Sequence, residues 1–84
     1  MVTYINEKIA AEAAEHGTLI GKTEPCRETK GMWWEVYSYR NELIACGCDS
    51  VAGICFGERL TLNELERYCD DLLEARNNYE RLSQ

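Results

Sequence analysis

The amino-acid sequence predicts one α+β domain, with helices at both ends of the chain packed on one face of an antiparallel sheet of three or four strands. Aromatic and β-branched residues are dense between Met32 and Gly57, where two runs separated only by Arg40-Asn41-Glu42 are typical of a β-hairpin. Helical patterns lie on both sides of this segment. At 84 residues, the chain is expected to form a single domain, residues 1–84, around a small core.

The N-terminal segment has the spacing of an amphipathic helix. Apolar residues recur at helical intervals along one side, and Gly17 is placed to stop the helix after about His16. Thr3 is placed to cap its start. The helix predicted from Thr3 to about His16 carries acidic residues on its other sides, Glu12 and Glu15 among them.

Four short segments predict the strands of a β-meander: Thr18–Thr23, Met32–Tyr39, Glu42–Cys48 and Ile54–Gly57. Pro25 ends the first, because proline cannot donate to a strand ladder. For the fourth, the alternative is an extended lead-in to the last helix.

The second strand carries bulky side chains on both faces. Period-two alternation places Trp34, Val36 and Ser38 on one face, and the other face holds Trp33, Tyr37 and Tyr39. If both helices cover the first face, the three aromatic residues remain partly exposed, which is typical of protein contact sites. The alternative is that these rings pack on each other or beneath loops.

The C-terminal segment predicts a helix from Thr61 to about Leu82. Thr61-Leu62-Asn63-Glu64 fits a capping box, in which a threonine hydroxyl and a glutamate carboxylate satisfy free amide groups at a helix start. The predicted core side of this helix is formed by Leu62, Leu65, Cys69, Leu72, Leu73 and Arg76.

Fifteen acidic and nine basic residues leave a net charge of −6, which repels nucleic-acid phosphates and favours basic partners. Direct binding of nucleic acid is therefore not expected. If the two helices share a face, their outer sides form one acidic panel, made of Glu64, Asp70, Asp71 and Glu74 with Glu12 and Glu15. Such a panel fits a basic groove that normally holds nucleic acid. The alternative is a solvated face with weak local ion pairs.

The five cysteines are an odd number in a chain that shows neither a secretion signal nor a membrane-spanning segment, so we expect a cytoplasmic protein with reduced thiols. Cys46, Cys48 and Cys55 are the candidate metal ligands. Their spacing differs from the Cys-x-x-Cys pairs of structural zinc sites, and we expect neither metal nor cofactor. His16 is the only histidine, and we find no nucleophile or phosphate-binding motif, so we expect no enzymatic activity.

The order helix, meander, helix in a short acidic chain resembles small phage-encoded anti-CRISPR proteins. The resemblance rests on the acidic last helix, Leu62 to Leu72, and on the tyrosine-rich strand Trp34 to Tyr39. It implies a protein that acts in the bacterial cytoplasm, docks on a CRISPR effector and blocks it by occlusion, without chemistry of its own. Two other functions remain open: a structural or regulatory subunit that dimerises through its aromatic sheet face, and a thiol or metal protein.

Overall fold

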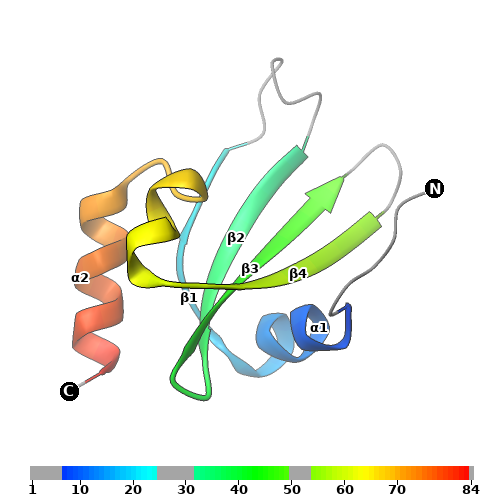
Figure 1. Ribbon diagram of the computed structural model, residues 1–84, viewed down its shortest axis with the longest axis horizontal. Coiled ribbons are helices and arrows are strands. Elements are labelled where there is room, and N and C mark those ends of the chain that lie inside the picture. The colour runs from blue at the N-terminus through cyan, green and yellow to red at the C-terminus, as the bar shows by residue number, and fades with distance from the viewer. Residues whose placement is uncertain (1–6, 25–31, 50–53, 84) are drawn as a thin grey trace.

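The computed structural model describes residues 7–24, 32–49 and 54–83. Its elements follow the chain in the order α1 (Glu7–His16), β1 (Thr18–Lys22), β2 (Met32–Tyr39), β3 (Glu42–Asp49), β4 (Ile54–Leu60), the 3₁₀ helix η1 (Leu62–Arg67) and α2 (Leu72–Leu82) (Figure 1). The α+β class and the antiparallel meander predicted from the sequence are confirmed.

The four strands form one open sheet in the order β1-β2-β3-β4, with neighbouring strands antiparallel. A two-residue turn joins β2 to β3, and its residues Arg40 and Asn41 have φ angles of 52° and 63°. Positive φ at both turn positions defines a type I′ turn, whose twist matches that of the flanking strands. The predicted hairpin is confirmed. The fourth strand also forms, and it extends beyond the predicted Gly57 to Leu60.

Helix α1 ends at His16, as predicted, and the chain turns directly into β1. The backbone N–H of Gly17 donates to the carbonyl of Ala13 at 2.8 Å. A Cβ at Gly17 would lie 2.9 Å from the carbonyl oxygen of Ser38, so a larger residue does not fit this turn. The predicted cap Thr3 lies outside the described residues.

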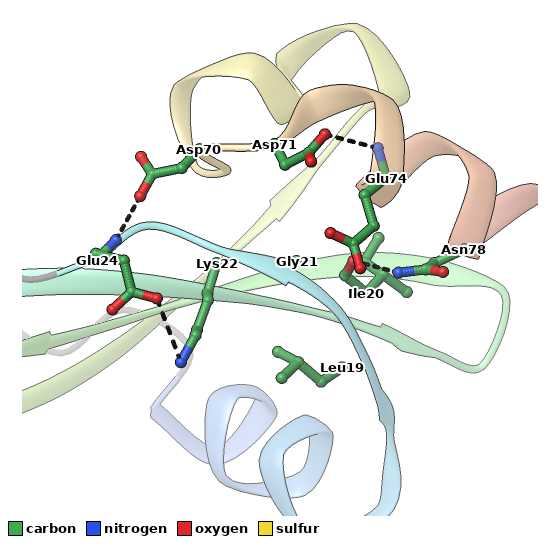
Figure 2. Close-up of a pocket in the computed structure, with 9 residues that line it drawn as sticks. All are labelled: Leu19, Ile20, Gly21, Lys22, Glu24, Asp70, Asp71, Glu74 and Asn78. Atoms are coloured by element: carbon green, nitrogen blue, oxygen red, sulfur yellow. Dashed lines mark hydrogen bonds and ion pairs between the residues drawn. The ribbon is translucent and has the colours of Figure 1, made fainter.

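The two α-helices lie on opposite faces of the sheet, so the prediction of one shared face is wrong. On one face, Val36 and Ala45 belong to a buried cluster completed by Leu65 of η1 and Ala75 of α2. On the other face, Ile44 packs with residues of α1. Figure 2 shows the strands between α1 on one side and η1 with α2 on the other.

The alternation of β3 explains this arrangement. Leu43 and Ala45 are buried on one face, while Ile44 and Cys46 are buried on the other. Because both faces of the strand are apolar, each face needs its own cover to exclude water. Two close approaches show where the covers meet the sheet: a Cβ at Gly57 would lie 2.7 Å from Ala10 of α1, and one at Gly21 would lie 2.9 Å from Ala75 of α2.

The single C-terminal helix predicted over Thr61–Leu82 is divided into η1 and α2. The backbone N–H of Asp70 donates to the carbonyl of Lys22 at 3.0 Å, which ties the segment between the helices to the end of β1. Cys69 is buried there. Asp71 then caps α2, because its carboxylate accepts a hydrogen bond of 3.0 Å from the N–H of Glu74. Tertiary contacts with β1 thus interrupt the helix.

The break also changes which residues face the core. Leu73, predicted on the core side, is 71% exposed, and Ala75 is fully buried instead. The capping box predicted at Thr61 forms at the start of η1, with Glu64 accepting from the N–H of Thr61 at 3.0 Å. Within the described part of the chain, none of the helices has the length and apolar character needed to cross a bilayer.

Candidate functional site

A groove of about 380 Å³ lies between the outer edge of β1 and the start of α2. At Gly21 the two elements approach closely, since a Cβ at this position would lie 2.8 Å from the sulfur of Cys69. Figure 2 shows the residues that line the groove. They are Leu19, Ile20, Gly21, Lys22 and Glu24 from β1 and the residues after it, and Asp70, Asp71, Glu74 and Asn78 from the C-terminal region.

Three hydrogen bonds hold the two walls of the groove together. The side-chain amide of Asn78 donates to the carbonyl of Ile20 at 3.0 Å, and the N–H of Asp70 donates to the carbonyl of Lys22. The N–H of Glu24 donates to the carboxylate of Asp70 at 2.8 Å. Because these bonds use backbone groups of the chain from Ile20 to Glu24, the groove is built into the fold.

The groove is acidic. Four carboxylates line it, from Glu24, Asp70, Asp71 and Glu74, against the single positive charge of Lys22. The Lys22 ammonium lies 3.6 Å from Glu24, and both side chains are more than 45% exposed, so this ion pair is weak. The carboxylates of Asp70, Asp71 and Glu74 are exposed, whereas the Leu19 side chain lies on the other side of β1, toward α1 (Figure 2). This arrangement suits a ligand that carries a cationic group.

The structure brings together only part of the predicted acidic panel. Asp70, Asp71 and Glu74 gather in the groove, as a C-terminal acidic surface requires. Glu12 and Glu15 lie on α1, across the sheet, so the shared panel does not form and that prediction is wrong. The cause is the apolar character of both sheet faces, which places the helices apart.

Glu64 has a structural role instead. Its carboxylate accepts hydrogen bonds from the N–H of Thr61 at 3.0 Å and from the Thr61 hydroxyl at 2.9 Å. The backbone hydrogen bond from Thr61 is the main reason why the pKa of Glu64 is lowered. Glu64 therefore serves the helix start. Glu24, in contrast, lines the groove but was not predicted as a site residue. No sequence pattern around Glu24 and Lys22 indicates that Glu24 lies near the C-terminal acidic residues.

The sequence predicted that the aromatic face of the sheet is left open. In the structure, α1 packs over this face. Tyr37 and Tyr39 are partly buried against the cluster formed with α1. The Tyr37 hydroxyl donates to Glu35 at 3.1 Å, and the Tyr39 hydroxyl donates to Glu12 at 3.5 Å. Trp33 is also partly buried. The role of these rings as a contact surface stays a prediction.

Two of the cysteines lie in the core. Burial, with a smaller contribution from the charge of Asp70, raises the pKa of Cys69 to about 11. Cys46 is buried under α1, and its thiol donates to the carbonyl of Ala10 at 3.6 Å. Cys26 lies outside the described residues. Within residues 7–24, 32–49 and 54–83, the structure contains no cluster of three or more His, Cys, Asp or Glu side chains that could hold a metal ion.

Comparison with known proteins adds no relative to this picture. The chain matches no family model, no curated protein and no solved structure.

Proposed function

We propose that the protein is a non-enzymatic binding module that attaches to a basic protein surface through the groove between β1 and α2. The observation that carries this proposal is the concentration of four carboxylates against one lysine around a groove of about 380 Å³. Such a groove attracts a lysine or arginine side chain, because its carboxylates can pair with the positive charge.

The charge of the whole chain acts in the same direction as the groove. A net charge of −6 draws a basic partner toward the protein from a distance and keeps nucleic acid away. Basic surfaces of this kind are found in complexes that handle nucleic acid, where they normally contact phosphates. The protein would occupy such a surface and exclude its ligand.

The resemblance to small anti-CRISPR proteins suggests the biological form of this activity. In that form the protein is an inhibitor of phage type that works in the bacterial cytoplasm and docks on a CRISPR effector. Inhibition there requires only occlusion, and the carboxylates of the groove would supply the contact.

Glu74 offers the sharpest test. Its carboxylate takes part in no described hydrogen bond or ion pair, whereas Asp70 and Asp71 both accept backbone hydrogen bonds. Glu74→Lys should therefore change the charge of the groove with only a small loss of stability, roughly 0.3–1 kcal/mol, because Glu74 lies in the first turn of α2. Glu15→Lys, on the exposed surface of α1 across the sheet, is the matched control because it changes the net charge by the same amount.

The assay is an NMR titration of the full chain with an arginine-rich peptide. We expect shifts confined to the groove, an affinity that falls with added salt, and a loss of about fivefold to tenfold at low salt for Glu74→Lys but not for Glu15→Lys. Equal losses in both variants would mean that only net charge matters, and would reject the groove.

A second assay addresses the inhibitor form. The protein is added to a purified, guide-loaded CRISPR effector, and binding of target DNA is measured. Wild type should reduce target binding, Glu74→Lys should relieve the inhibition, and Glu15→Lys should inhibit like wild type. Full inhibition by Glu74→Lys would show that the groove is not the docking surface.

A further inference from the structure

A second pocket lies on the α1 face of the sheet, beside the turn between β2 and β3. It is lined by residues of α1, of the turn itself and of β2, β3 and β4 next to the turn. Its volume is about 170 Å³. Pockets for drug-sized ligands usually measure roughly 300–1,000 Å³, so this one suits a smaller molecule.

Part of the pocket is apolar. Ile44 of β3 is almost completely buried, and Ile9 of α1 is partly buried in the same cluster. The ring of Tyr39 packs against this cluster as well. All three side chains line the pocket, so an apolar group bound there would be removed from water.

Four charged side chains also line the pocket, and two of them neutralise each other. The Nε of Arg59 donates to the carboxylate of Glu42 at 2.6 Å. The other two are placed by Tyr39: the Arg40 guanidinium carbon lies 5.2 Å from the centre of the Tyr39 ring, and the Tyr39 hydroxyl donates to Glu12 at 3.5 Å. Among the described residues, neither Arg40 nor Glu12 has an ion-pair partner.

Arg40 and Glu12 can both bind a ligand group of opposite charge. A guanidinium carries five N–H donors and pairs well with a carboxylate, and stacking on the Tyr39 ring leaves these donors available. The bond of 3.5 Å from Tyr39 to Glu12 is longer than the usual 2.5–3.0 Å or so between two oxygens, so this carboxylate can accept from a stronger donor such as an ammonium. A ligand with both groups has no net charge and is not repelled by the acidic chain.

We propose that this pocket binds a free α-amino acid with a branched apolar side chain, of the leucine or valine class. The ligand carboxylate pairs with Arg40, its ammonium pairs with Glu12, and its side chain lies against Ile9 and Ile44. Tyr39 contacts both charged groups and so sets their spacing. The site lies across the sheet from the acidic groove and does not depend on the function proposed for that groove.

The test is an NMR titration of the full chain with L-leucine. We expect shifts at the residues of the pocket and a dissociation constant on the order of 1 mM. Leucinamide lacks the carboxylate, isocaproate lacks the ammonium and glycine lacks the apolar side chain, so each should bind at least about fivefold more weakly. Leucine shifts outside the pocket, no shifts at all, or equal binding of leucine and any of these analogues would overturn the proposal.

Matched variants identify the two charged groups. Arg40→Asn removes the guanidinium, and asparagine tolerates the φ angle of 52° at this turn position. Glu12→Gln removes the charge but keeps an acceptor for the Tyr39 hydroxyl. Each should weaken leucine binding by about fivefold or more, whereas Arg40→Lys should weaken it less than Arg40→Asn does, and Glu15→Gln on the exposed surface of the same helix should bind like wild type. Spectra of the free variants compare their folds, and wild-type affinity in either Arg40→Asn or Glu12→Gln would reject the assigned pairing.

Discussion

The close approach of α2 to β1 predicts the effect of a single methyl group. Gly21→Ala places a Cβ 2.8 Å from the sulfur of Cys69 and 2.9 Å from the Cβ of Ala75, both of which are buried. These distances are shorter than van der Waals contact. The helix segment must therefore move away from the strand, or the side chains must shift.

The size of the effect follows from two opposing contributions. Overpacking a core costs roughly 1–3 kcal/mol. Replacing glycine also reduces the entropy of the unfolded chain, which returns about 0.4–1 kcal/mol. We expect a net loss of about 1–2 kcal/mol in the free energy of unfolding, or about 5–15 °C in melting temperature for a domain of this size.

Urea unfolding followed by circular dichroism measures this loss. Lys22→Ala, at the next residue of the same strand, is the control and should change stability by less than about 0.5 kcal/mol, since that side chain is 49% exposed. Cys69→Ala removes the atom at 2.8 Å, so the double variant should lose less than the sum of the two single variants. Wild-type stability in Gly21→Ala, or strict additivity in the double variant, would refute the described contact.

Three further outcomes follow from the C-terminal region. Asp71→Ala should lower the free energy of unfolding in urea by about 1 kcal/mol, while Asp71→Asn, which still caps α2, should lower it by much less; equal losses would contradict the cap. Because the pKa of Glu64 is lowered in the folded state, its contribution is present above its ordinary pKa of 4.5 and disappears as the pH falls through the lowered value. The stability gap between wild type and Glu64→Ala should therefore close in acid, and a gap independent of pH would disprove the linkage. With its pKa raised from 9.0 to about 11, Cys69 should react with iodoacetamide at pH 8 roughly a hundredfold more slowly than in the urea-unfolded chain, and similar rates would show that the thiol is accessible.

Local features of the fold could be predicted from the sequence because neighbouring residues determine them. The turn at Arg40 and Asn41 and the capping box at Thr61 each depend on a few consecutive side chains and backbone groups. The α+β order followed from the same kind of information. Gly17 ended the first helix as expected.

Features that depend on contacts between distant residues could not be predicted in the same way. The face on which each helix packs follows from the burial of Leu43 and Ile44 on opposite sides of β3. The prediction placed both helices on one face because it assumed that the other face of the sheet is open to solvent. The break after η1 depends on the hydrogen bond from Asp70 to Lys22, far apart in sequence. The predicted acidic panel therefore forms only in part: Asp70, Asp71 and Glu74 share a groove, while Glu12 and Glu15 lie across the sheet.

The hydrogen bonds that Asn78 and Asp70 make to β1 also limit how copies of this chain can associate. A sheet with two bare edges can add copy after copy and grow into a fibre. Here the carbonyls of Ile20 and Lys22 are already occupied by groups from the same molecule, which leaves β4 as the other border of the sheet. Edge-to-edge growth through this sheet would therefore end at a pair of copies joined at β4, because the β1 edge of each copy is already hydrogen-bonded to its own C-terminal region.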